Sequence, residues 1–303
     1  MKNQKFGIEI EMTGISRKTA AKTIAEYFNT RIIEDHDGYD TIRIPDNRGR
    51  YWKIVRDVSI REQNSRQERG EKVEMVSPIC VYDDIIPIQE IVRKLKDKGA
   101  LANSSCGIHI HINASVHNAK TLRNITNIMA SKEDIIYKAL QVNVARENRY
   151  CRKVEPRFLE ELNRRKPQTL NEVSSIWYNG YDGRHEHYHS SRYHCLNLHS
   201  VFSKGTIEFR LFNGTLHAGK IKAYILLSLA INKQALTQKK ASCKKAQEEN
   251  EKFAMRVYLN RIGFIGDEYK NYREHLYKHL DGSAAWRYGA DNPKYKKNKK
   301  EEK

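Results

Sequence analysis

The chain has 303 residues, 39% of them hydrophobic, which is enough to bury the core of one large domain or two ordinary ones and excludes global disorder. Its five cysteines are widely spaced and form no CxxC pair, which excludes a zinc ribbon and a disulfide framework. No apolar stretch is long enough to span a bilayer, and no signal-peptide core follows the first residues. We therefore expect a cytoplasmic protein without membrane contact.

The formal charge of +18 is unevenly distributed along the chain. Residues 151–303 carry 30 Lys and Arg against 17 Asp and Glu, whereas residues 1–150 carry 25 against 20. A basic surface of this kind attracts polyanions, but it also serves simply to keep a protein soluble. A nucleic-acid-binding protein, with polyanion contact through the basic C-terminal region, therefore stays open as an alternative function.

Hydrophobic periodicity predicts the secondary structure in chain order. Strands are expected at residues 5–12, 39–44, 50–58, 72–77, 106–113, 193–202 and 206–212. Helices are expected at residues 16–28, 83–99, 120–145 and 220–236, with a charged helical region from 239 onward. Ser16 is expected to cap the first helix, residues 61–70 to form a loop, and residues 203–205 to close a hairpin between the last two strands. Strands separated by helices, with at least one hairpin, predict an α+β fold with a mostly antiparallel sheet.

Three of the predicted strands carry polar residues on one face and apolar residues on the other. Because side chains alternate across a sheet, residues two apart share a face. The polar sets are Glu9 with Glu11, His109 with His111 and Asn113, and Glu208 with Arg210, and a shorter strand adds Glu74. An antiparallel sheet with one wet face alternates in this way by default. Ordinary wet faces are rich in Lys, Thr and Ser, however, whereas these carry metal ligands and a phosphate-binding cation.

If these strands are neighbours in the sheet, several carboxylates face one another, and their mutual repulsion favours bound cations. Oxygen ligands with few imidazoles suit Mg²⁺ or Mn²⁺ better than Zn²⁺. Divalent metals together with an arginine are the means by which phosphoryl transfer is catalysed. The pattern therefore indicates an ATP site, although neither a P-loop nor a dinucleotide-binding fingerprint occurs.

A histidine-rich stretch leaves a third class open, a metal-dependent hydrolase. His-x-His also suits a zinc site, to which further ligands would come from His185, His187, His189, His194 and His199. We interpret residues 185–189 instead as a polar loop leading into the next strand, because nothing fixes them on a rigid element.

Five segments, taken in order, resemble the amidoligase family, which is part of the carboxylate–amine ligase superfamily that includes glutamine synthetase and glutamate–cysteine ligase. The segments are residues 6–11, 52–59, 73–78, 106–111 and 206–215. The resemblance covers roughly residues 5–235. It implies a glutamine-synthetase-like catalytic fold, in which a curved, mostly antiparallel sheet forms a funnel, ATP and metals bind its concave face, and helices pack on its outer face.

The resemblance also implies roles for individual residues. The metal ligands would be Glu9, Glu11, Glu74, His109 and Glu208. The catalytic residues would be Arg210, which contacts the transferred phosphate, with Glu208 and Asp57. The cofactor contacts would be Arg210, His111, Ser59 and Asn197. The implied reaction joins a carboxylate substrate to an amine substrate, either an amino acid or a peptide or protein, through an acyl phosphate formed with ATP and Mg²⁺ or Mn²⁺.

Two segments have no counterpart in this resemblance, and they suggest how the chain is organised into domains. Residues 1–236 are expected to form the amidoligase-like catalytic domain, with residues 150–190 inserted over the site. Residues 237–303 are expected to form a basic helical extension that ends in a mobile tail. The Arg and Lys content of these two segments fits an acidic substrate.

Overall fold

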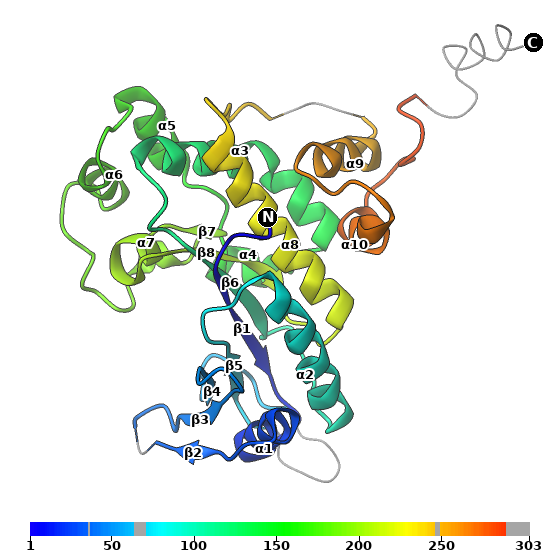
Figure 1. Cartoon of the computed structure of the whole chain (residues 1–303). Helices are drawn as coiled ribbons and strands as arrows, with labels where there is room; N and C mark the ends of the chain where they lie inside the picture. The colour runs from blue at the N-terminus through cyan, green and yellow to red at the C-terminus, as the bar shows by residue number, and fades with distance from the viewer. Residues whose placement is uncertain (36, 64–70, 246–248, 289–303) are drawn as a thin grey trace, which may run out of the picture.

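The computed structural model describes residues 1–35, 37–63, 71–245 and 249–288. Within these residues it contains one open sheet of eight strands and ten α-helices (Figure 1). The strands are β1 (Phe6–Met12), β2 (Ile33–Glu34), β3 (Ile42–Pro45), β4 (Tyr51–Val55), β5 (Val73–Val76), β6 (Gly107–Asn113), β7 (Leu196–Asn197) and β8 (Thr206–Asn213). The helices are α1 (Arg17–Phe28), α2 (Ile85–Asp97), α3 (Ala119–Leu140), α4 (Val144–Tyr150), α5 (Pro156–Arg165), α6 (Leu170–Trp177), α7 (His199–Lys204), α8 (Ala218–Thr237), α9 (Glu251–Arg261) and α10 (Lys270–Tyr277). The predicted α+β class is confirmed.

The sheet runs in the order β2-β3-β4-β5-β1-β6-β8-β7, and its strand pairs are antiparallel. The first strand in the sequence therefore lies near the middle of the sheet, between β5 and β6. These neighbours come from distant parts of the chain, so the polar faces of the predicted strands are placed side by side only by tertiary folding.

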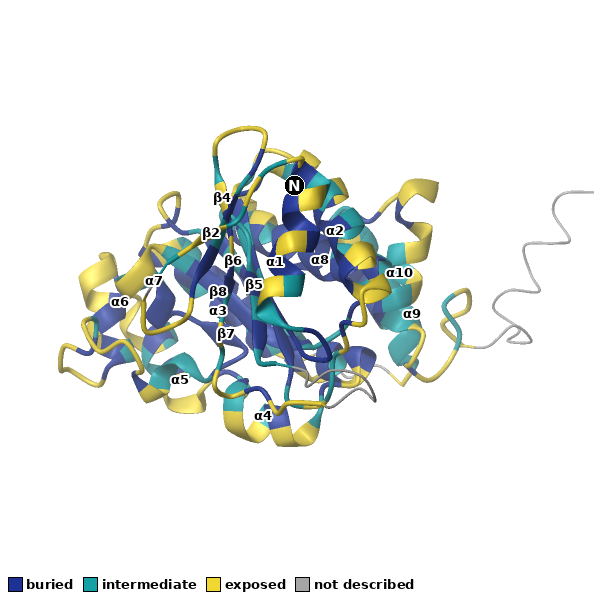
Figure 2. Cartoon of the chain, turned by 90° about the horizontal axis from the view of Figure 1, so that it is seen from below, coloured by how far each residue is buried: buried dark blue, intermediate teal, exposed yellow. Residues whose placement is uncertain are grey.

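The apolar faces of these strands form one wall of the core. Ile8, Ile10 and Met12 on β1 are at most 1% exposed, as are Ile108 and Ile110 on β6. Helices α2, α8 and α3 lie along this side of the sheet (Figure 1), and the buried residues concentrate in the sheet and on the helix faces turned toward it (Figure 2). Each fully buried side chain of this size contributes about 1.5–3 kcal/mol to folding. The alternation in the sequence therefore decides which face is left for polar chemistry.

The predicted strand over residues 193–202 is wrong beyond Asn197, because the chain continues as helix α7. Gly205 was expected in a hairpin loop, but with φ 71° it is the left-handed residue that ends this helix. Strands β7 and β8 do pair antiparallel, yet a short helix connects them instead of a three-residue loop. The helical turn buries Ser200 against the sheet, where its hydroxyl contacts that of Thr206 at 2.8 Å.

Two helical regions also differ from the prediction. The long helix expected over residues 120–145 ends at Gln141, whose φ of 50° is left-handed. A second helix, α4, follows after a short break. Residues 150–190, where no helix was expected, contain α5 and α6, which are capped by the side chains of Glu155 and Thr169. The predicted cap of the first helix by Ser16 is confirmed, because its hydroxyl accepts from the Thr19 amide at 3.0 Å.

The C-terminal helices α9 and α10 pack on the helical layer. Met255, Leu259 and Leu276 are buried in the same hydrophobic core as the sheet. Most of the predicted loop over residues 61–70 and the whole basic tail lie outside the described residues. Within the described ranges, no helix combines the length and the apolar composition needed to cross a bilayer.

A buried ionic cluster ties the β3–β4 turn to the segment that follows β5. Arg50 donates from both Nη atoms to Asp84 at 2.9 Å, from Nε to Asp46 at 2.8 Å, and to the Ile79 carbonyl at 3.0 Å. The side chains of both aspartates are only 2% exposed. Burial acts to raise the pKa of each carboxyl group, but the Arg50 and backbone donors outweigh it and lower the pKa. This cluster therefore holds the start of β4 against the segment that follows β5.

We expect Asp84→Asn to reduce the free energy of unfolding by about 2 kcal/mol at neutral pH, because the partly buried Arg50 guanidinium loses one of its two buried charged acceptors. Since the folded-state pKa of Asp84 is depressed, its contribution is present above the unfolded pKa and is lost as pH falls through the folded one. Denaturant titrations at neutral and acidic pH would measure both effects. The control is Asp281→Asn, which breaks a pair with Lys138 in which Asp281 is 82% exposed, and should leave stability close to that of the wild type. Equal losses in the two variants would contradict the prediction.

Candidate active site

Four adjacent strands, β5, β1, β6 and β8, bring the predicted polar residues onto one face of the sheet. The register places Glu9 opposite His109 and Glu11 opposite Glu74. On the other side of β6, His111 stands opposite Glu208. The side chains that the alternation predicted to share a face thus form one continuous row across the sheet.

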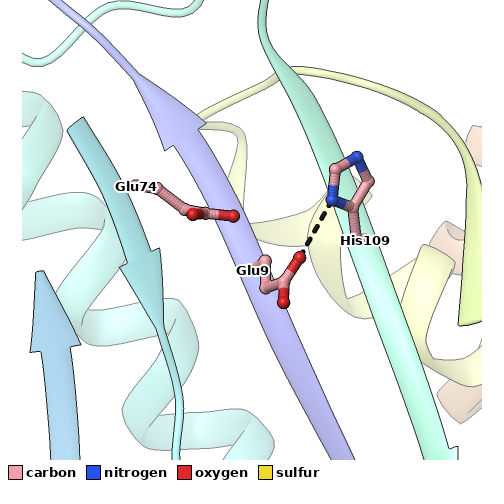
Figure 3. A group of neighbouring side chains, drawn as sticks. All are labelled: Glu9, Glu74 and His109. Carbon is pink, nitrogen blue, oxygen red and sulfur yellow. Dashed lines mark hydrogen bonds and ion pairs between the residues drawn. The ribbon is translucent and has the colours of Figure 1, made fainter. Parts of the chain in front are cut away.

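Two histidines and their neighbouring carboxylates form the centre of this row. His109 Nδ1 lies 3.0 Å from Glu9 Oε2, and His109 Nε2 lies 3.6 Å from Glu11 Oε1. His111 Nε2 lies 3.2 Å from the other oxygen of Glu9 and 3.8 Å from Glu208 Oε1. Figure 3 shows Glu9 on β1 between Glu74 on β5 and His109 on β6. Glu9 is therefore the residue through which the two halves of the row meet.

Arg210 shares the face of Glu208 by alternation and lies at a β-bulge in β8. Ile108 pairs with Phe212 but Ile110 pairs with Phe209, so two residues of β8 stand opposite His109. Arg210 forms an ion pair with Glu208 and donates from Nε to the Tyr150 carbonyl at 3.4 Å. The second oxygen of Glu208 accepts from Asn197 Nδ2 at 2.6 Å.

Opposite charges stabilise the ionised form of two carboxylates. Burial acts to raise the pKa of Glu9, but attraction to His111 and His109 outweighs it and holds the pKa well below its ordinary value. Burial likewise opposes ionisation of Glu208, yet Arg210 and the two histidines lower its pKa to about 2. In turn, Glu9 and Glu208 overcome the effect of burial on His111 and raise the pKa of its imidazole. In this half of the row, toward β8, neighbouring positive charges therefore balance the charges of the carboxylates.

In the other half of the row, toward β5, burial and repulsion between carboxylates outweigh the attraction of nearby positive charges. Burial, followed by repulsion from Glu9, Glu11 and Asp57, raises the pKa of Glu74 well above its ordinary value. Burial also raises the pKa of Glu11, with a further contribution from Asp57 and against the attraction of His109. Close carboxylates whose pKa values rise because they repel one another are the environment in which a bound cation gives the largest gain.

The donor atoms of this row fit a divalent cation. Among the described residues, three groups place their ligand atoms within 4.8 Å of one another: Glu9, Glu74 and His109; Glu9, His111 and Glu208; and Glu11, Asp57 and Glu74. In addition, His111 Nε2 is buried without a well-formed hydrogen bond. Carboxylate oxygens outnumber imidazole nitrogens, which favours Mg²⁺ or Mn²⁺. The structure thus brings together all five predicted metal ligands and adds Asp57 and His111 to them.

Three cavities open onto the row. The first, here called the Pro78 cavity, measures about 470 Å³ and is lined among others by Lys5, Glu9, Pro78, His111 and Lys204. The second, the Asp57 cavity, measures about 290 Å³ and is lined among others by Glu11, Asp57, Ser59, His109, Arg192 and Arg210. The third, the His187 cavity, measures about 250 Å³ and is lined among others by Arg184, His187, Arg192, Asn197, Lys204 and Glu208. The predicted cofactor contacts are therefore divided, with His111 in the first cavity, Ser59 and Arg210 in the second and Asn197 in the third.

A family model described as "putative amidoligase enzyme" matches residues 2–232. The chain belongs to this family. The match includes all eight strands and most of α8, whereas α9 and α10 lie beyond it. The resemblance noted in the sequence is confirmed, and family membership indicates an enzyme of the ligase type. No curated protein matches the chain.

The amidoligase site contains cations that sequence reasoning missed. Arg146 on α4 is 3% exposed and donates from Nη2 to the carbonyls of Arg210 and Phe212, both at 3.4 Å. Arg192 and Lys204 each line two of the three cavities. All three lie outside residues 150–190, whose Arg content was noted in the sequence, and no periodicity distinguishes them from the other basic residues of the chain.

The histidine-rich stretch does not form a metal site within the described residues. None of its five histidines belongs to a group of three potential metal ligands. His199 Nδ1 is hydrogen-bonded to the Tyr178 hydroxyl at 2.6 Å, and His189 stacks on the His199 ring with a centroid separation of 5.6 Å. These contacts give the stretch a packing role and remove the extra ligands that a zinc hydrolase was expected to take from it.

We expect Gly107→Ala to destabilise the amidoligase by about 1–3 kcal/mol, because a Cβ at this position would overlap the guanidinium of buried Arg146. The Gly107 amide also donates to Glu11 Oε2 at 2.6 Å, so metal affinity should fall as well. Denaturant unfolding and Mn²⁺ titration would measure the two effects. Gly38→Ala is the control, since nothing lies within 4 Å of its Cβ, and it should change stability by no more than about 0.5 kcal/mol.

We expect Mn²⁺ to bind the purified protein and to raise its thermal unfolding midpoint, because the ion relieves the repulsion among the carboxylates. Glu9→Gln should weaken binding by about tenfold or more, since Glu9 belongs to two of the three ligand groups. Calorimetry and electron paramagnetic resonance would measure the affinity. Glu34→Gln, at the exposed edge of the same sheet, removes one charge far from the row and should leave it unchanged. Equal effects of the two substitutions would show that binding depends on net charge alone.

Proposed function

We propose that this amidoligase is an ATP- and Mg²⁺-dependent carbon–nitrogen ligase that forms an amide or isopeptide bond through an acyl phosphate. The observation that supports the proposal most strongly is the row of carboxylates and histidines on one sheet face, with Arg210 beside it and a separate cavity at each approach. A ligase of this type needs charge neutralisation and room for two substrates and a nucleotide. We further propose that the fold is glutamine-synthetase-like, with this face forming the concave wall of a funnel.

The Pro78 cavity has the character of a nucleotide site. Val76, Pro78 and Ile79 supply apolar surface at its edge, and Ile79 is 71% exposed, as suits contact with a base. Lys204 lines the same cavity, whose inner end reaches Glu9 and His111. The adenine would thus bind near Ile79 and the phosphates would point toward the row, with His111 as a cofactor contact.

In the first step, a carboxylate oxygen of the acid substrate attacks the γ-phosphorus of ATP, the bond to the β,γ-bridging oxygen breaks, and ADP leaves. Glu9, Glu11, Glu74, His109 and Glu208 would hold Mg²⁺ or Mn²⁺, which supplies positive charge near the phosphate oxygens. The Arg210 guanidinium, held by Glu208 and the Tyr150 carbonyl, would stabilise the negative charge of the transferred phosphoryl group.

In the second step, the amine nitrogen attacks the acyl carbon, inorganic phosphate leaves, and the nitrogen loses a proton. Asp57 lines the cavity that also contains Arg210, and its Oδ1 is oriented by the Ser59 amide at 2.7 Å. We assign Asp57 the role of accepting the proton of the incoming amine. The acid and amine would be amino acids or parts of a peptide or protein, and the enzyme would act in the cytoplasm, where the basic C-terminal region would contact polyanions.

We expect the wild-type protein to bind a non-hydrolysable ATP analogue in the presence of Mg²⁺, and both Glu9→Gln and Glu208→Gln to abolish this binding while leaving the fold intact. Both carboxylates belong to the groups that could hold the cation, so losing either removes a metal ligand. Calorimetry would measure affinity, and circular dichroism would verify folding. Unchanged nucleotide affinity in both variants would contradict the site assignment.

The acyl phosphate has its own test, in which hydroxylamine replaces the amine in reactions containing ATP, Mg²⁺ and a panel of carboxylic acids. Formation of a hydroxamate together with ADP and phosphate supports the mechanism. AMP and pyrophosphate as products would instead show that the carboxylate is activated as an adenylate. Arg210→Gln should slow hydroxamate formation by about 100-fold or more, because it removes charge stabilisation of the transition state.

A further inference from the structure

The His187 cavity adjoins the row of carboxylates but is itself strongly basic. Its walls include the cationic or potentially cationic side chains of Arg184, His185, His187, Arg192 and Lys204. The one carboxylate among its lining residues is Glu208, which is already paired with Arg210. A neutral or cationic ligand would leave this positive charge unmatched, so the cavity suits an anion.

Arg192 is the guanidinium in this cavity that is not already paired with a carboxylate. Arg184 forms an ion pair with Asp182 at 2.9 Å. Among the described residues, Arg192 instead donates to the His187 carbonyl at 3.4 Å and forms no ion pair. Its guanidinium is thus available to a ligand, whereas that of its neighbour is partly neutralised.

The surroundings of Arg192 hold its guanidinium in place without neutralising it. The group lies 5.5 Å from the centroid of the Tyr188 ring and 5.7 Å from that of Tyr193. The Tyr188 hydroxyl is itself hydrogen-bonded at 3.1 Å to that of Tyr39, in the connection between β2 and β3. A planar guanidinium that is held by aromatic rings retains its donors for a bidentate carboxylate.

The position of Arg192 separates it from the nucleotide. It lines both the His187 cavity and the Asp57 cavity, but not the Pro78 cavity. Lys204, by contrast, lines the Pro78 and His187 cavities and could contact either a phosphate or a carboxylate. A substitution of Arg192 should therefore affect binding of the acid or the amine but not binding of the nucleotide.

We propose that Arg192 binds a carboxylate of the acid substrate other than the one that is activated, so that the substrate class is a compound with two or more carboxylates, such as an acidic peptide. This inference rests on the proposed ligase function. One carboxylate would reach the row near Glu208 and Arg210, while another would be held by Arg192 in the His187 cavity. Selectivity would come from the charge of the substrate on the side away from the reacting group.

The probes are tri-L-glutamate and tri-L-glutamine, whose side chains are uncharged so that only its terminal carboxylate remains, titrated calorimetrically into protein that is saturated with Mg²⁺ and a non-hydrolysable ATP analogue. The wild-type protein should bind tri-L-glutamate about tenfold or more tightly than tri-L-glutamine, which is the effect of one charge-assisted bidentate contact. Arg192→Gln should remove this preference, and Arg192→Lys, which keeps the charge but loses the fork, should retain only part of it. Affinity for the ATP analogue should stay within about twofold in both variants.

Arg165→Gln is the matched control. Arg165 lies on α5 and is 54% exposed in a pair with Glu161, so its loss changes the net charge equally without altering a cavity, and the preference should persist. The proposal is overturned if the wild type shows no preference, if Arg192→Gln keeps it, or if Arg192→Gln loses affinity for the ATP analogue instead, since Arg192 would then contact a phosphate. Failure of the wild type to bind the analogue with Mg²⁺ would reject the ligase function itself, whereas binding of the analogue without a preference for tri-L-glutamate rejects only the role of Arg192.

Discussion

The contact between Glu9 on β1 and His109 on β6 links the two halves of the row of carboxylates and histidines. The Glu9 side chain on β1 lies between those of Glu74 and His109 (Figure 3), and its second oxygen faces His111. Without the two imidazoles, burial alone would drive this carboxyl group toward its neutral form. The histidines therefore allow a charged acid to sit in the middle of a sheet whose other face is closed by the core. The strand pairing and the chemistry of the site share this one contact.

The row is asymmetric in charge, and this asymmetry separates two tasks. Toward β8, Arg210 and both imidazoles favour the ionised form of Glu208. Toward β5, Glu11, Glu74 and Asp57 repel one another with less compensation. A cation would gain most from the second group, whereas the first group presents an arginine to an anion. Binding of positive and negative partners is thus arranged along one line of residues.

Alternation in the sequence was sufficient to predict the strands of this site and the faces of their side chains. It predicted that Glu9 and Glu11 point to the polar side of β1 and that His109 and His111 point to the polar side of β6, because burial of the isoleucines between them leaves the chain no alternative register. The bulge in β8 could not be read in this way. It depends on how Arg210 and Leu211 are accommodated opposite His109, which is a property of the pairing and not of either strand alone.

Residues outside regular strands were much harder to predict. Gly205 suggested a hairpin, and only the structure shows that it ends a helix whose turn packs Ser200 on the sheet. Arg146 on α4 is buried because it contacts the backbone of β8 and occupies the space that a side chain at Gly107 would fill. These segments are far apart in the sequence. Arg192 lies on a short turn between α6 and β7, where no periodicity distinguishes it from the other basic residues nearby.

The same irregular segment covers the site on the side of the acid and amine. Tyr188 and Tyr193 line the Asp57 cavity, and the hydrogen bond between Tyr188 and Tyr39 connects this cover to the β2–β3 edge of the sheet. An acyl phosphate formed as proposed would be lost to water unless the amine reached it first, so exclusion of solvent matters more here than at the nucleotide end. The same tyrosines hold the Arg192 guanidinium, so this segment combines aromatic surface with the proposed anion contact. The segment that the sequence describes least well is therefore the part of the site that would distinguish one substrate from another.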